Sequence, residues 1–94
     1  MRVRWTRRSL RALDGIAERI AQDRPLAAGR VVLRIREAVD QLSLYPFLGR
    51  SGRVAGTREL IVAGTPFIVP YRIRDDVVEI LSVLHAARRW PERF

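Results

Sequence analysis

The chain has 94 residues, 48% of them hydrophobic, which is enough for one folded domain over residues 1–94 with a single two-layer core. It contains no cysteine, which excludes disulfides and thiolate zinc sites and fits a reducing cytoplasm. Eighteen basic and ten acidic residues give a net charge of +8, and all eighteen are arginine, which favours an anionic partner. A genome that favours arginine explains the same composition equally well.

Residues 2–5, RVRW, alternate arginine with Val3 and Trp5, which predicts a half-buried strand with Trp5 in the core. Thr6 follows as a candidate N-cap for a first helix. The apolar residues at helical spacing in this helix are Leu10, Leu13, Ala17, Ile20 and Ala21. We expect them to form its core face.

The letters QDRP end that first helix, and Pro25 suits the first turn of a second one. The second apolar stripe consists of Ala28, Val31, Val32, Ile35, Ala38, Val39 and Leu42. The two segments therefore predict an αα-hairpin. No apolar run approaches the length of a membrane span, and the N-terminus has no secretory signal, so we expect a cytoplasmic protein without a membrane role.

The second half of the chain predicts a sheet. Residues 45–56 form one long irregular stretch, and the strands that follow it are expected at 58–62, 67–73 and 77–84 as an antiparallel meander. Pro70 lacks a ladder donor, which indicates a bulge or an exposed edge in the middle strand. The predicted fold class is α+β with the order β-αα-βββ, a mostly antiparallel sheet with the helical hairpin packed on one face.

The segment TPFIVPYRIRDDVVEILSVLHAARRWP, residues 65–91, resembles the closing segment of the RelE/ParE superfamily of bacterial toxins. The resemblance extends upstream through YPFLGRSGRVAGTREL and to the element order. It implies the toxin of a type II toxin–antitoxin system, which the C-terminal segment of a neighbouring antitoxin holds inactive. RelE-like members cut messenger RNA on the ribosome, whereas ParE-like members poison DNA gyrase and block replication.

Chemistry helps to choose between these branches. Cleavage of RNA through its own 2′-hydroxyl requires a base, an acid and cations that stabilise the phosphorane. RelE-like members take the cations from lysines and arginines of the middle strands, but this chain has no lysine, and Glu59 follows Arg58. The next strand has no arginine before Arg72, and no tyrosine follows RRWPERF. These departures favour the ParE-like branch, which is not expected to be an enzyme.

Two alternatives remain. A related nuclease subgroup uses a histidine near the C-terminus, so an endoribonuclease would use His85 as acid or base, with Arg58, Arg72 and Arg88 at the phosphate. A structural or surface role is the simpler interpretation of a lone histidine at a strand end. The further alternative is a basic nucleic-acid-binding module without toxicity.

The arginine-rich end VLHAARRWPERF, residues 83–94, is interpreted as a binding surface rather than a reaction centre. The candidate residues for binding the target or partner are Arg58, Arg72, Arg88, Arg89 and Trp90. A solvated basic end, with Trp90 packing the C-terminus onto the sheet, is the alternative.

The expected partners are an acidic, amphipathic, ParD-like antitoxin in a hetero-oligomer and DNA gyrase as target. In the nuclease alternative, the target is the ribosome with its messenger RNA. We expect no metal, because the carboxylates have no histidine or cysteine companions at ligand spacing. We expect no cofactor either, because the glycine-containing loop lacks the lysine and helix signal of a phosphate site.

Overall fold

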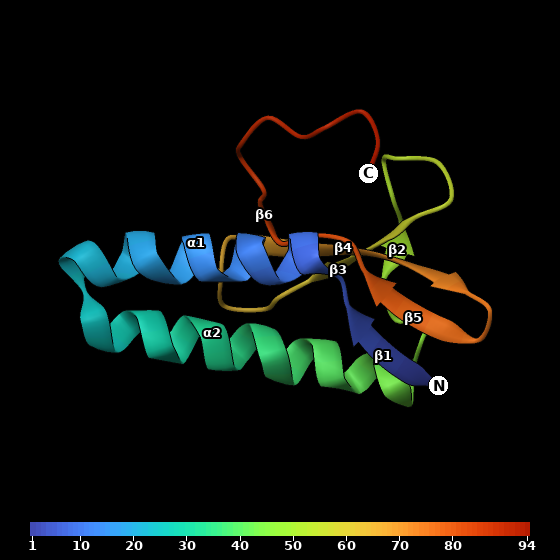
Figure 1. The fold of residues 1–94 in the computed structure, drawn as a ribbon, viewed down its shortest axis with the longest axis horizontal. Coiled ribbons are helices and arrows are strands. Elements are labelled where there is room, and N and C mark those ends of the chain that lie inside the picture. Colours follow the sequence, from blue (N-terminus) through green and yellow to red (C-terminus); the bar gives the residue numbers. More distant parts are fainter.

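Two helices lie against one face of a six-stranded sheet in the computed structural model, which describes residues 1–94 (Figure 1). In chain order the elements are β1 (Arg2–Trp5), α1 (Arg7–Asp23), α2 (Pro25–Asp40), a 3₁₀ turn (Gln41–Ser43), β2 (Arg50–Ser51), β3 (Arg58–Ile61), β4 (Phe67–Arg74), β5 (Val77–Ile80) and β6 (Leu84–His85). The strand order is β1-β5-β4-β3-β2, with β6 beside β4, and only β1 and β5 run parallel. This confirms the predicted α+β class and its mostly antiparallel sheet.

Both helices begin where their capping signals predict. The Thr6 hydroxyl accepts a hydrogen bond from the Ser9 N–H at 3.1 Å, which satisfies one of the free donors of the first turn. Only Arg24 separates the helices, and Pro25 is the first residue of α2. The second apolar stripe is buried or half-buried along its whole length, as predicted.

The core face of α1 is rotated from the predicted one. The residues that face the core are Ser9, Ala12, Leu13, Ile16 and Ile20. Leu10 is 42% exposed, and Ala21 is exposed as well. The cause lies at the cap, because the Thr6 hydroxyl donates to the Ile80 carbonyl of β5 at 2.6 Å and so holds the Ser9 side of the first turn against the sheet.

The predicted strand over 77–84 is interrupted at residues 81–83, opposite Pro70. Tyr71 pairs with Ile80 and Ile68 pairs with Leu84, so two residues of β4 face three residues of the neighbouring strand. The Pro70 carbonyl still accepts from the Leu81 N–H at 2.9 Å, but proline has no N–H to return. Pro70 therefore lies at a bulge in a central strand and not at an edge. The short β2 within residues 45–56 was not predicted either.

The register places different side chains on the two faces of the sheet. Trp5, Ile80 and Tyr71 form one row across β1, β5 and β4, on the face that packs against the helices. The adjacent row, Arg4, Glu79 and Arg72, must lie on the opposite face because side chains alternate along a strand. Tyr71 is fully buried and Trp5 half-buried against the core, as predicted for Trp5.

Candidate functional site

A groove of about 590 Å³ lies between α1, the start of β4 and β6. Figure 1 shows β6 and the segment after it beside α1. The lining residues outside the helices come from the β4 start and from the arginine-rich end, including His85, Arg88 and Arg89. Three of the residues expected in a site are therefore brought together here.

The rim of the groove is cationic. Arg11 and Arg19 of α1 line the groove together with Arg88 and Arg89, all four are exposed, and no carboxylate lines it. Gly15 lies between the two helix arginines at a spacing of four, so all three residues share one stripe of α1. Its missing side chain leaves open space at that point of the rim.

Sequence reasoning missed the two helix arginines, although their spacing carried the signal. Residues 11, 15 and 19 recur at the helical period and flank the core-facing residues Ala12, Ile16 and Ile20. Arginine is so frequent in this chain that Arg11 and Arg19 do not stand out in the sequence. Their role becomes visible only in the structure, where α1 lies beside the arginine-rich end.

The floor of the groove is apolar. It is formed by Ala12, Ile16, Ile20, Val31, Phe67, Val83 and Leu84. An apolar floor with an arginine rim suits an amphipathic segment that carries carboxylates, because arginine forms bidentate hydrogen bonds with them. The geometry therefore favours binding of an acidic peptide.

His85 is held by its neighbours within this groove. Its ring stands edge-on to the Phe67 ring, with centroids 5.7 Å apart and an angle of 87° between the planes. Its Nδ1 accepts a hydrogen bond from the Ala87 N–H at 3.1 Å, so the neutral ring carries its proton on Nε2. Both contacts are ones that a structural histidine makes.

Arg58 lies outside the groove. Its side chain is on the same face as Tyr71, its partner in the β3–β4 register. Its Nη1 donates to the Gly49 carbonyl at 2.6 Å and to the Phe47 carbonyl at 3.4 Å. This arginine therefore binds the backbone of the loop before β2.

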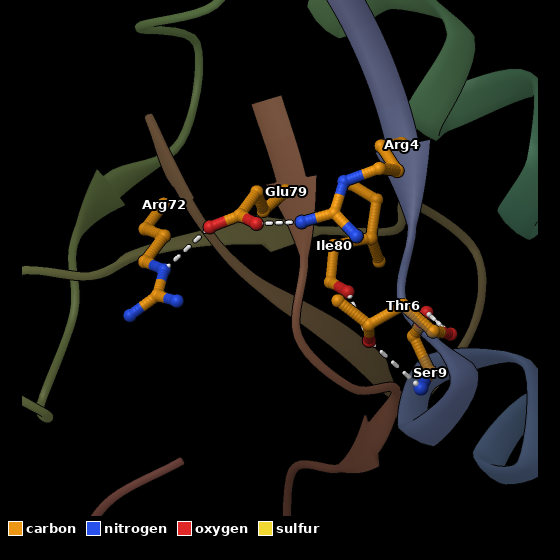
Figure 2. A network of polar contacts seen from close by, with 6 residues as sticks. All are labelled: Arg4, Thr6, Ser9, Arg72, Glu79 and Ile80. Atoms are coloured by element: carbon orange, nitrogen blue, oxygen red, sulfur yellow. Dashed lines mark hydrogen bonds and ion pairs between the residues drawn. The ribbon is translucent and has the colours of Figure 1, made fainter. Parts of the chain in front are cut away.

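Arg72 lies on the other face of the sheet, one residue after Tyr71. Figure 2 shows that its Nε points to the Glu79 carboxylate, which it meets at 2.7 Å, while Arg4 reaches the second oxygen of the same carboxylate. Glu79 is buried, so the two arginines compensate its charge. The structure thus does not bring Arg58, Arg72 and His85 together.

Trp90 joins the C-terminal segment to two parts of the chain. Its Nε1–H donates to the His85 carbonyl at 3.2 Å, and the Arg53 guanidinium lies 3.5 Å from its ring centroid. Stacking of this kind contributes about 0.5–1 kcal/mol at an exposed site. Trp90 is therefore tethered both to β6 and to the loop after β2.

Metal binding and membrane insertion are two further functions on which the structure bears. No group of three or more histidine, cysteine or acidic side chains is placed to hold a metal ion. Neither helix has the length and apolar character needed to cross a membrane.

A family model described as "ParE toxin of type II toxin-antitoxin system, parDE" matches residues 3–90. The chain is 56% identical over 91 residues to the protein named "Putative toxin Y4kP" of Sinorhizobium fredii, covering 97% of this chain and 94% of that one. It is 43% identical over 84 residues to toxin RelE2 of Caulobacter vibrioides, covering 89% and 93%.

Solved structures agree with the sequence relatives. A chain of the chromosomal ParDE system of P. aeruginosa superimposes with a TM-score of 0.82 and 30% identity, over 88% of this chain and 92% of that one. A chain of the RelBE2 toxin–antitoxin complex of Mycobacterium tuberculosis gives a TM-score of 0.67 and 26% identity, over 89% and 95%. The chain therefore belongs to the ParE toxin family of type II toxin–antitoxin systems, within the RelE/ParE superfamily that its sequence resembles.

Proposed function

We propose that this toxin arrests growth by binding and inhibiting DNA gyrase, without turnover chemistry, and that a cognate antitoxin neutralises it. The observation that carries the proposal is that the groove does not bring together the residues that RNA cleavage would need. His85 is the only histidine, carboxyl or phenol among the residues that line the groove. Cleavage through the 2′-hydroxyl needs a base and an acid, and the groove offers one group for both tasks.

The arginines of the middle strands are also engaged elsewhere. Arg58 donates to loop carbonyls on one face of the sheet, and Arg72 is paired with Glu79 on the other. Stabilising a phosphorane requires several cations directed at one point. The separation of these two side chains by the sheet supports inhibition through binding.

The arginine-lined groove is the proposed antitoxin site. Its apolar floor and its rim of Arg11, Arg19, Arg88 and Arg89 complement an acidic amphipathic segment, which adds affinity through the floor and orientation through the rim. The similar P. aeruginosa and M. tuberculosis chains come from toxin–antitoxin systems, which supports such a partner here. The partner would form a hetero-oligomer with the toxin.

A ribosome-dependent endoribonuclease is the second candidate. Two observations favour it: the 43% identity to a toxin named RelE2, and the presence of His85 beside Arg88 and Arg89 in one groove. In this reading His85 transfers the proton and the two arginines bind the phosphate. It requires a second proton-transfer group from the ribosome or from the RNA itself.

Induced expression separates the two candidates. The gyrase proposal predicts growth arrest with filamentation and a DNA-damage response, while messenger RNA stays intact. Primer extension on abundant transcripts is the direct check, and rapid codon-specific cleavage would contradict the proposal. Co-expression of the antitoxin from the adjacent reading frame is the control and is expected to restore growth.

A further inference from the structure

An exposed apolar run follows the second helix, away from the groove. Within residues 44–48 the exposed fractions are 77% for Leu44, 63% for Tyr45, 66% for Phe47 and 51% for Leu48. Folded proteins rarely leave so many large apolar side chains together in water unless another molecule covers them. These five residues are called the apolar loop below.

Buried groups fix the backbone of the apolar loop. The Tyr71 hydroxyl donates to the Pro46 carbonyl at 2.7 Å and accepts from the Gly49 N–H at 2.9 Å. Arg58 donates to the Gly49 carbonyl at 2.6 Å, and its guanidinium lies 5.0 Å from the Phe47 ring centroid. Gly49 itself has no room for a side chain, since an added Cβ would lie 2.7 Å from a Tyr71 ring carbon.

Because the loop backbone is already fixed, less conformational entropy is lost when a partner binds. A polar group as deeply buried as the Tyr71 hydroxyl must be hydrogen-bonded, and its partners are Pro46 in the apolar loop and Gly49 directly after it. Burial also raises the pKa of the Tyr71 phenol above its ordinary value of 10.0, against the opposing effects of the Gly49 N–H and Arg58. The phenol is therefore a neutral donor at physiological pH. The backbone of the apolar loop is therefore fixed by the fold, while its side chains are exposed to solvent.

The apolar surface continues to the open edge of the sheet. Leu48 lines a second cavity of about 500 Å³ together with Ile61, which is 55% exposed. β2 pairs only with Glu59 and Arg58, so β3 is uncovered beyond that point. None of the residues that line this cavity lines the arginine-lined groove. The molecule therefore has two separate surfaces.

Charge indicates what covers the apolar loop. Residues 43–58 contain three arginines and no carboxylate. Arg50 and Arg53 share the buried Glu59, and Arg58 has no acidic partner, so the segment that carries the loop remains positive. A second copy of a chain with charge +8 would be repelled. An apolar protein surface with an acidic rim is complementary.

We propose that the apolar loop is the surface with which the toxin docks onto its target protein, while the arginine-lined groove receives the antitoxin. The inference rests on the proposed function to the extent that the target is a protein. Rigid aromatic and aliphatic side chains on a fixed backbone are the anchors that dominate the energy of protein interfaces.

The test uses two loop variants of the full chain, Phe47→Ser and the double variant Leu44→Ser/Tyr45→Ser. The matched control is Leu26→Ser, because Leu26 is 78% exposed at the start of α2. Growth arrest after induction, thermal unfolding, and binding of the purified antitoxin from the adjacent reading frame are measured for each. Both loop variants are expected to be about tenfold or more weaker in growth-arrest activity, as for substitutions at an interface anchor. Their unfolding midpoint and antitoxin affinity are expected to equal those of Leu26→Ser and wild type.

Inhibition of purified DNA gyrase is measured in parallel. If wild type inhibits gyrase and the loop variants do not, the docking surface is assigned to that target. If wild type leaves gyrase unaffected but the loop variants still lose growth arrest, the docking surface stands and the gyrase proposal falls.

Three outcomes would overturn the inference. The first is growth arrest by the loop variants equal to that by wild type. The second is loss of antitoxin affinity together with toxicity, which would make the loop part of the antitoxin site. The third is co-sedimentation of wild type, but not of the loop variants, with vesicles of phosphatidylethanolamine and phosphatidylglycerol. That result would assign the apolar loop to a lipid surface.

Discussion

The Tyr71 hydroxyl links the core of the sheet to the apolar loop through one donated and one accepted hydrogen bond. Replacing it by phenylalanine would leave the buried Gly49 N–H and the Pro46 carbonyl without these partners. We expect Tyr71→Phe to lower the free energy of unfolding by about 1–3 kcal/mol, the cost of an unsatisfied buried polar group. Urea unfolding measures the loss. Tyr45→Phe is the control, because Tyr45 is 63% exposed, and an equal effect of both variants would refute the assignment.

The same phenol predicts how stability depends on pH. Burial raises its folded-state pKa above the ordinary value of 10.0. The stability that it contributes is therefore fully present below about pH 10 and is lost as the pH rises above that value. Between neutral pH and strongly alkaline pH, the unfolding free energy of wild type should fall more than that of Tyr71→Phe. Parallel slopes for the two proteins would argue against a buried, neutral phenol.

Single arginines show where prediction from the sequence stops. Arg58 and Arg72 are equally plausible phosphate ligands in the sequence, but a strand register decides which face each occupies. Tyr71 pairs with Arg58, and Arg72 is its neighbour along β4, so the two guanidiniums are on opposite faces. Arg88 and Arg89 were predicted as binding residues, and the structure places them on the groove rim with two helix arginines that were not. Their binding role stays a prediction.

At the scale of elements, the connection between β1 and α1 determines how the helical hairpin meets the sheet. The Thr6 hydroxyl accepts from the Ser9 N–H at 3.1 Å and donates to the Ile80 carbonyl at 2.6 Å (Figure 2). Thr6→Ala removes both bonds, and we expect it to cost about 1–2 kcal/mol of unfolding free energy. Thr6→Ser keeps the hydroxyl and should recover most of that loss. A fully stable Thr6→Ala protein in urea unfolding would show that the cap is dispensable.

The helices and strands were predictable to different degrees, for physical reasons. Capping residues and a helical period are local signals, so both helices were placed correctly from Thr6 and Pro25. The rotation of the α1 core face depends on the bond between Thr6 and Ile80, which lie 74 positions apart. A bulge or an exposed edge was predicted at Pro70. The interruption itself lies in the partner strand, at residues 81–83, and only the pairing of the strands in the structure reveals it.

At the scale of the whole molecule, the net charge of +8 predicts rapid capture of an acidic partner. Association with the antitoxin should slow as salt rises, because steering is screened beyond a Debye length of about 8 Å at physiological ionic strength. We expect Arg88→Ala, at the arginine-lined groove, to slow association with the antitoxin while growth arrest and the free energy of unfolding stay close to wild type. Arg2→Ala, at the far edge of the sheet, is expected to change all three little. Stopped-flow mixing across a salt series measures the association rates, and growth arrest and urea unfolding measure the other two quantities. A salt-independent rate together with wild-type antitoxin association of Arg88→Ala would identify the arginine-rich end as a solvated tail.

The most direct test of the central claim, inhibition by binding, is DNA supercoiling by purified gyrase in the presence of the purified toxin, with wild type and His85→Gln compared. We expect both proteins to inhibit supercoiling equally, because no proton transfer at His85 is required, and both to leave messenger RNA on ribosomes uncut. The account would be contradicted if wild type left supercoiling unchanged and cleaved ribosome-bound messenger RNA. In that case His85→Gln would cleave about 10²–10⁴ times more slowly, as expected when a general acid or base is removed.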